Sequence, residues 1–138
     1  MQVQPYLFFE GRCDEAIAFY KKAIGAEVQM LMRYKDAPEG ECAGGAKHPP
    51  DKVMHSSLTI GDSTVMLSDG NCSGKTNFSG ITLSIDGKDD AQTEKLYAAL
   101  ADGGTPIVPL MKTFFSSKFG MLNDRFGLTW MVLTAMEK

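Results

Sequence analysis

The feature that most constrains the fold is an internal repeat. Each half of the 138-residue chain reads as a strand, a helix and three further strands. Glycines stand before and after the predicted helix in both halves, Gly11 and Gly25 in the first and Gly87 and Gly103 in the second. Glycine is a common stop signal for helices, and a repeat of this length is too long for a solenoid unit. The pattern therefore predicts a duplicated βαβββ module.

Apolar spacing places the elements within each half. The predicted helices cover 14–23 and 90–100, where apolar residues recur at helical spacing after acidic residues, and the second is expected to be slightly longer. The predicted strands cover 2–9, 27–34, 53–60, 64–67, 80–86, 105–111, 116–122 and 128–134, and a Pro- and Gly-rich loop covers 35–51. We expect one α+β domain over 1–138, whose modules, about 1–70 and 78–138, form a cup-shaped, mostly antiparallel mixed sheet.

Charge and cysteine usage narrow the partners and the compartment. A formal charge of −3 and a pI near 5.3 disfavour nucleic acid as a partner, because phosphate-binding domains are normally basic. No apolar run reaches the length of a membrane span, so no membrane partner is expected. Three cysteines without a CxxC pattern favour a reduced, cytoplasmic protein. Asp124 and Arg125 are interpreted as a solvated pair in a turn.

Several segments carry a resemblance to a known family. They are PYLFFEGRCDEAIAFYKKAIGAEV (5–28), VMHSSLTIGDSTVMLSDG (53–70), SGKTNFSGITLSID (73–86) and FGMLNDRFGLTWMV (119–132). Together they resemble the PhnB-like family of the vicinal oxygen chelate superfamily, which includes glyoxalase I, extradiol dioxygenases and bleomycin-resistance proteins. The resemblance implies paired βαβββ modules and a homodimer, but it implies no single activity. Some members are labelled 3-demethylubiquinone 3-methyltransferase, yet this sequence has no Gly-rich turn of the kind that holds a nucleotide-like cofactor.

The resemblance also implies four positions at which metal enzymes of the superfamily carry ligands. Alignment places them at Pro5, Leu67, Gly80 and Met131. Proline, glycine and leucine have no side-chain donor, and methionine offers only a soft thioether. We therefore expect neither a metal ion nor another cofactor, and metal-dependent lyase or dioxygenase chemistry is disfavoured.

Period-two alternation predicts what lines the cup. In 53–60 the apolar set Met54, Leu58 and Ile60 is expected to pack against a helix, which turns His55 and Ser57 toward the cup. Matching phases in the other strands complete the predicted ligand-binding set, which is Phe9, His55, Ser57, Leu67, Asp69, Thr82 and Met131. A mixture of apolar surface and a few polar groups is typical of a small-molecule site.

His55 is the imidazole predicted to lie in the cup, and it is the candidate catalytic residue. It could donate a hydrogen bond, bind an anion when protonated, or act as a general base; the alternative is a structural histidine bonded to a neighbouring strand. The sequence therefore predicts a metal-free protein that binds a small molecule in the sheet cup. The alternative is an enzyme of the lyase or isomerase type that uses His55 as acid or base, or an unconventional metal site.

Overall fold

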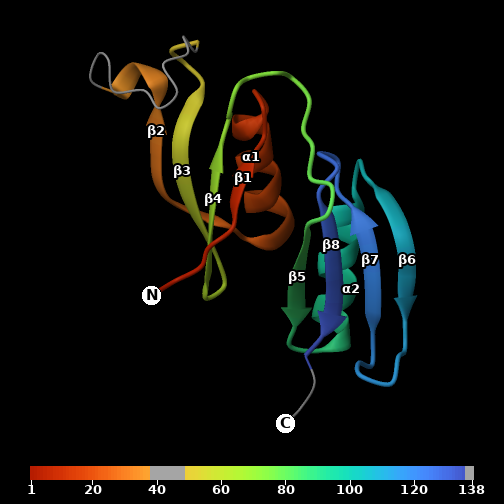
Figure 1. Ribbon diagram of the computed structural model, residues 1–138. Helices are drawn as coiled ribbons and strands as arrows, with labels where there is room; N and C mark the ends of the chain where they lie inside the picture. Colours follow the sequence, from red (N-terminus) through yellow and green to blue (C-terminus); the bar gives the residue numbers. More distant parts are fainter. Residues whose placement is uncertain (38–48, 136–138) are drawn as a thin grey trace. The chain divides into compact units, whose positions relative to one another are not determined.

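Residues 1–37 and 49–135 are described by the computed structural model, in which the chain forms two compact units, Met1–Thr76 and Asn77–Lys138. Figure 1 shows one sheet and one long helix in each unit. The first unit contains β1 (Tyr6–Phe8), α1 (Cys13–Ile24), β2 (Glu27–Arg33), β3 (Val53–Ile60) and β4 (Ser63–Ser68). The second contains β5 (Thr82–Gly87), α2 (Asp90–Ala101), β6 (Thr105–Met111), β7 (Phe119–Asn123) and β8 (Thr129–Thr134).

The two sheets share one topology. Their strand orders are β1-β4-β3-β2 and β5-β8-β7-β6, so the second sheet repeats the first element by element. In each sheet the first strand of the module pairs in parallel with the fourth, and the other neighbours are antiparallel. The predicted duplication of a βαβββ module is therefore confirmed, and so is the α+β class; the hydrogen-bonded sheets are two open ones of four strands each.

The helices begin and end close to their predicted bounds. Each has 12 residues, so the expectation of a longer second helix was wrong. Asp14 and Glu15 lie in the first turn of α1 and Lys21 and Lys22 in its last turn, which complements the helix dipole. Gly25 ends α1 in the left-handed conformation with φ 69°, which glycine adopts without steric cost. Within the described residues, neither helix has the length and hydropathy that crossing a bilayer would require.

The long connection from β2 to β3, predicted as a loop over 35–51, opens with one 3₁₀ turn at Tyr34–Asp36. Just before it, the Arg33 guanidinium donates to both carboxylate oxygens of Asp14, at 2.8 and 2.9 Å, and so ties the end of β2 to the first turn of α1. This hydrogen bonding is the main reason that the pKa of Asp14 is lowered. Residues 38–48 of the predicted loop lie outside the described residues.

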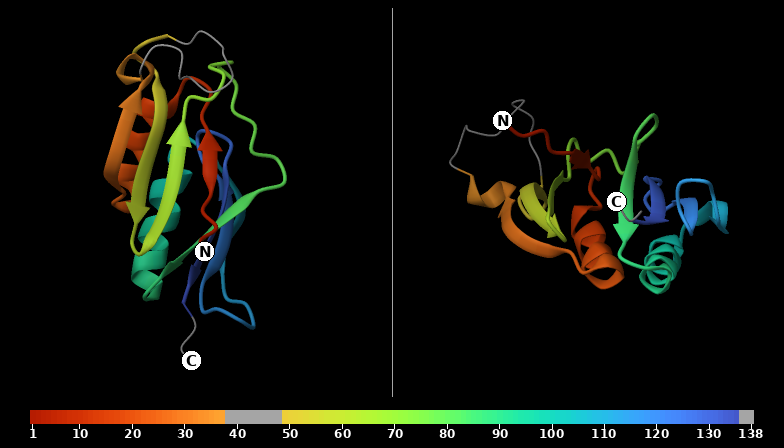
Figure 2. Two further views of the ribbon diagram at one scale, coloured as in Figure 1. Left: turned by 60° about the vertical axis from the view of Figure 1, so that its left-hand side comes forward. Right: turned by 90° about the horizontal axis from the view of Figure 1, so that it is seen from below.

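One face of the first sheet packs against α1. Cross-strand pairing puts Leu7, Ser56, Leu58, Val65 and Leu67 on the same face, and all five are buried. The Cys13 Sγ at the start of α1 lies 4.0 Å from the Ser56 Oγ on β3, which identifies this face as the one beneath the helix (Figures 1 and 2). The opposite face of the first sheet is called the open face below.

The second sheet packs against α2 in the same way. Leu122 on β7 pairs with Trp130 on β8, and both are buried, as is Val132. Gly120 is required beneath the helix, because a Cβ at this position would lie 2.7 Å from the Tyr97 ring. The Tyr97 hydroxyl uses this space to donate to the carbonyl of Val108 at 2.9 Å. The helix is therefore fixed to the sheet by apolar packing and by a polar contact.

Burial predicts the reactivity of the cysteine thiols. Cys13 has no exposed surface, and desolvation together with the nearby Asp69 charge raises its pKa to about 12. Cys72 is partly exposed, and its pKa is raised less, again mainly by desolvation. Because only the thiolate is nucleophilic, we expect iodoacetamide at pH 8 to label Cys72 well before Cys13 in the native protein. Peptide mapping by mass spectrometry measures both rates; equal native rates would contradict the prediction, and labelling in urea is the control.

Candidate functional site

A row of side chains in register crosses the open face of the first sheet. Tyr6 on β1 pairs with Met66 on β4, Met66 pairs with Ser57 on β3, and Ser57 pairs with Met30 on β2. Tyr6 and Met30 are 38% and 41% exposed, while Met66 and Ser57 are partly exposed. The row therefore offers mixed aromatic, thioether and hydroxyl groups on a strand scaffold, which suits a small organic molecule.

Tyr6 and His55 make the central polar contact of this face. The Tyr6 hydroxyl lies 2.9 Å from the His55 Nδ1, and the two rings are stacked with centroids 5.5 Å apart and an interplanar angle of 25°. Because β4 lies between β1 and β3, the Tyr6 side chain must cross β4 to reach the imidazole. Phe8 extends the cluster, with its ring centroid 5.2 Å from that of Tyr6 and a side chain that remains 53% exposed.

The Tyr6 contact determines what the imidazole offers to a ligand. When the Tyr6 hydroxyl donates to Nδ1, the neutral imidazole carries its proton on Nε2 and presents an N–H donor. When the imidazole is protonated, Nδ1–H donates to the Tyr6 oxygen and Nε2–H remains available as a charged donor. In these two arrangements the pair presents a donor suited to a carboxylate or phosphonate oxygen. In the third, a neutral imidazole donates its Nδ1–H to the Tyr6 oxygen and presents Nε2 as an acceptor.

His55 and Ser57 lie on the open face, where the sequence placed them, but three other predicted residues of the first module do not. Leu67 is 1% exposed and faces α1, as its pairing with Ser56 requires. Phe9 has no exposed surface, and its ring packs edge-on against Tyr20 of α1 at 6.0 Å. The predicted phase was wrong by one residue in β1 and β4, and a slip of one residue exchanges the two faces of a strand.

Asp69 is the third residue that the sequence placed incorrectly. It has no exposed surface, and its carboxylate accepts from the backbone N–H of Cys13 at 2.7 Å and of Val53 at 2.6 Å. Its own N–H donates to the Val53 carbonyl at 2.9 Å. Asp69 therefore joins the end of β4 to the start of α1 and the start of β3 and does not face the open side of the sheet.

Thr82 and Met131 lie on the face of the second sheet that is turned away from α2. Met131 pairs with Ser84 on β5 and with Met121 on β7, and it alternates with the buried Trp130 and Val132. Thr82 is exposed at the start of β5. The structure therefore brings His55 and Ser57 together on one sheet and puts Thr82 and Met131 on the corresponding face of the other.

The four positions aligned with metal ligands are not equivalent in the structure. Pro5 and Gly80 stand before the strands to which they were assigned, and Leu67 faces α1; the residue of β4 that lies opposite Tyr6 on the open face is Met66. Within 1–37 and 49–135, no three His, Cys, Asp or Glu side chains are grouped so that they could hold a metal ion.

Sequence reasoning did not identify Tyr6 or Phe8 as site residues. The available signal was the two-residue turn at Gly61 and Asp62, which pairs Ile60 with Ser63 and hence Leu58 with Val65. Because Leu58 was already predicted to face the helix, that register puts Met66 on the open face. The parallel partner of Met66 is Tyr6, but that pairing follows only from the tertiary structure.

Comparison with known proteins assigns the family. A family model described as 3-demethylubiquinone-9 3-methyltransferase matches residues 1–133. The chain belongs to this family. The solved structure of protein PA1353 from Pseudomonas aeruginosa is similar over 99% of both chains, with 34% identity and a TM-score of 0.84. The PhnB protein from Bacillus cereus, whose structure is similar over 98% of this chain and 100% of its own, shares 25% identity and a TM-score of 0.79.

A more distant neighbour shares the fold. A glyoxylase/bleomycin resistance protein/dioxygenase domain from Frankia sp. EAN1pec shares 13% identity and a TM-score of 0.66 over 98% of this chain and 95% of its own. At that identity the similarity concerns the fold alone. The PhnB-like resemblance and the glyoxalase/bleomycin-resistance fold are both confirmed.

Proposed function

We propose that this PhnB-like protein binds a small organic anion, without a metal ion, on the open face of its first sheet. The observation that supports the proposal most is the stacked and hydrogen-bonded pair of Tyr6 and His55, which is flanked by the exposed Phe8 ring. The imidazole would donate to a carboxylate or phosphonate, and the aromatic and thioether side chains would contact an apolar substituent.

The family name alone does not supply the activity, because the fold supports many chemistries. A second candidate is an enzyme of the lyase or isomerase type, in which His55 moves a proton. The contact with Tyr6 favours this candidate in the tautomer whose Nδ1–H donates to the Tyr6 oxygen, because the unprotonated Nε2 is then oriented as a general base requires. We further propose a cytoplasmic homodimer; the two free thiols among the described residues support a reducing compartment, and a homodimer is implied by the family resemblance.

The first test of the anion site is a titration of the protein with phenylacetate and phenylphosphonate, followed by NMR. Replacing His55 with alanine should weaken binding of both probes at least tenfold, which corresponds to about 1.4 kcal/mol. Tyr6→Phe keeps the ring but removes the hydroxyl, so a smaller loss is expected. Thr64→Ala, on the same face but away from the imidazole, is the matched control. Unchanged affinity in His55→Ala would contradict the proposal.

The pH dependence of binding gives a second test. A protonated imidazole attracts an anion more strongly than a neutral one, so both probes should bind more tightly in acidic than in neutral buffer. His55→Ala should remove this dependence. Recovering the probes chemically unchanged after long incubation supports a binding protein, whereas turnover that His55→Ala abolishes supports the enzyme.

A further inference from the structure

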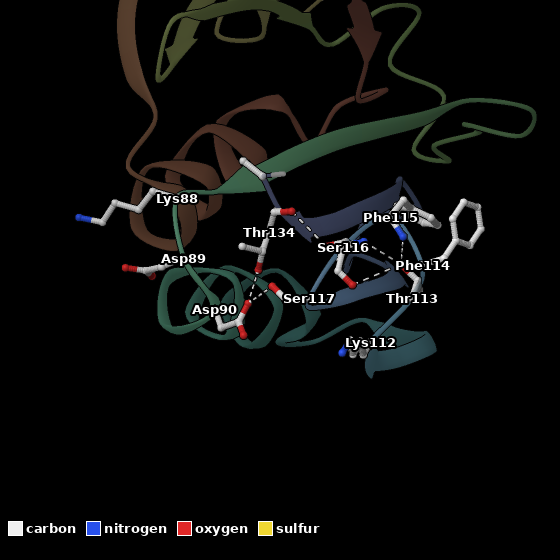
Figure 3. A pocket seen from close by; sticks show the side chains of 11 residues that line it. Lys88, Asp89, Asp90, Lys112, Thr113, Phe114, Phe115, Ser116, Ser117 and Thr134 are labelled. Atoms are coloured by element: carbon white, nitrogen blue, oxygen red, sulfur yellow. Dashed lines mark hydrogen bonds between the residues drawn. The ribbon is translucent and has the colours of Figure 1, made fainter. Parts of the chain in front are cut away.

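The second unit contains a pocket of its own. It has a volume of about 510 Å³ and lies between the start of α2, the connection from β6 to β7 and the end of β8 (Figure 3). The residues that matter for its chemistry are Lys88, Asp90, Lys112, Phe114, Ser117 and Thr134. With Asp89 and Phe115, which also line it, the pocket combines two carboxylates, hydroxyl groups, two aromatic rings and two lysines.

Asp90 is an oriented anion at one end of the pocket. Its Oδ1 accepts from the Ser117 hydroxyl at 2.6 Å and from the Thr134 hydroxyl at 2.7 Å (Figure 3). These two hydrogen bonds lower the pKa of the carboxyl, and so favour its charged form. Within the described part of the chain, no group donates to the second oxygen, Oδ2. The charge of Lys118 also lowers the pKa of Asp90, but the Lys118 ammonium is bonded directly to Glu94. The Oδ2 atom can accept a hydrogen bond from a ligand.

Two aromatic rings lie at the other end of the pocket. Phe115 is partly buried, and its ring centroid lies 5.2 Å from that of Phe119, so it is anchored to β7. Phe114 packs edge-on against Phe115 with centroids 5.2 Å apart, yet it is 98% exposed. A fully exposed phenylalanine beside an anchored one offers apolar surface that a ligand could cover.

In the first module, the carboxylate at the start of the helix forms an ion pair with an arginine of the same module. There the Arg33 guanidinium, at the end of β2, binds both oxygens of Asp14 in the first turn of α1. The corresponding strand of the second module, β6, ends at Met111, which carries no charge. Lys118 is paired with Glu94 instead of Asp90. Among the described residues, the second module therefore has the acid and a nearby lysine, but it has no direct ion pair like that between Arg33 and Asp14.

We propose that the pocket binds an organic cation, an amine or guanidinium that carries an aromatic or apolar group. The cation would take the place at Asp90 that Arg33 takes at Asp14, and its apolar part would cover Phe114 and Phe115. A flexible linker would bridge the intervening hydroxyl groups. Figure 3 shows Lys88 extending away from Asp90, which leaves the carboxylate accessible. The competing occupant is an organic anion held by Lys88 and Lys112.

The experiment compares three probes that share a phenyl group on a short alkyl chain and differ in the charge and type of the head group: 4-phenylbutylamine, 4-phenylbutanol and 4-phenylbutyrate. Each is titrated into the full chain, and backbone amide shifts are followed by NMR. We expect the amine to shift the amides of Asp90, Ser117 and Phe114 with a dissociation constant near the millimolar range, because the pocket is shallow. The alcohol and the butyrate should bind at least fivefold more weakly.

Variants separate the two ends of the pocket. Asp90→Asn retains an oxygen that can accept from Ser117 and Thr134 but loses the charge, so amine binding should weaken at least fivefold. Phe114→Ala should weaken it about threefold without any effect on folding, since the side chain is 98% exposed. Asp86→Asn, an exposed acid on β5 that does not line the pocket, is the matched control and should leave binding unchanged.

Three outcomes would overturn the proposal. They are amine binding that Asp90→Asn leaves unchanged, tighter binding of the butyrate to the same amides, and no response of those amides to the amine up to its solubility limit. If Asp90→Asn fails to fold, Phe114→Ala alone decides, because unchanged amine affinity in that variant is equally incompatible with the site.

Discussion

Replacing Asp124 with alanine is expected to lower the free energy of unfolding by about 3–5 kcal/mol. The side chain is 3% exposed and lies in the turn between β7 and β8. Its Oδ1 accepts from the backbone N–H of Phe126 at 2.9 Å and of Leu128 at 3.1 Å, and its Oδ2 accepts from the Trp130 Nε1 at 2.9 Å. Alanine would leave three buried donors without these partners, and each orphaned donor costs free energy.

The comparison with Asp124→Asn distinguishes this network from simple loss of volume. An asparagine oxygen can still accept from the two turn amides, but its NH₂ would face the Trp130 N–H, donor against donor. We expect an intermediate loss of stability, and we expect Trp130→Phe to relieve part of it in the double variant. Urea unfolding followed by circular dichroism measures the free energy of unfolding of the unsubstituted protein, of Asp124→Ala, of Asp124→Asn and of the double variant. Asp62→Ala, in an exposed turn, should change stability by less than about 0.5 kcal/mol.

A loss below about 1 kcal/mol in Asp124→Ala would show that water reaches the three donors and that the network is not buried in solution. Such a result would instead support the interpretation from sequence, in which Asp124 and Arg125 form a solvated pair in a turn. The structure contradicts that interpretation for Asp124, while Arg125 reaches the Asp102 carbonyl at 3.1 Å on the surface. The local sequence NDRFG indicates a turn but does not show that the Trp130 indole donates a hydrogen bond to the turn aspartate.

The elements that sequence predicted best are those with a local cause. Both helices carry apolar residues at helical spacing and acids in their first turns, and every predicted strand has a counterpart. The repeat could be recognised because the glycines at the helix ends and the order of the elements recur together. The element order could be predicted from these local signals, because the helical spacing of apolar residues and the glycines at the helix ends do not depend on which strands become neighbours.

The face of a strand is harder to predict when both of its faces carry apolar residues. In β1, Tyr6 and Phe8 alternate with Leu7, so hydrophobicity alone does not show which of these side chains face the core. The structure selects Leu7 for the core because it pairs with Leu67 beneath α1, which leaves the two aromatic rings for the open face. The contact between Tyr6 and His55 joins residues 49 positions apart across an intervening strand. No local pattern encodes such a contact.

Replacing Asp69 with alanine is expected to lower the free energy of unfolding by about 2–4 kcal/mol. The substitution leaves the N–H groups of Cys13 and Val53 without the carboxylate, at the point where β4, α1 and β3 meet. Because Cys13 N–H belongs to the first turn of α1, the helix also loses the negative group near its positive end.

Asp69→Asn separates the charge from the hydrogen bonds. Its oxygen can serve only one of the two backbone donors, since the amide nitrogen would face the other, so most of the loss should remain. Asp51→Ala is the control, because that carboxylate is 86% exposed and its ion pair with Lys35 is 3.4 Å long; a change below about 0.5 kcal/mol is expected. If Asp69 lined a ligand site as the sequence predicted, Asp69→Ala would leave stability nearly unchanged and weaken phenylacetate binding. A structural Asp69 gives the reverse: large destabilisation by urea unfolding, with phenylacetate affinity of the folded fraction close to that of the unsubstituted protein.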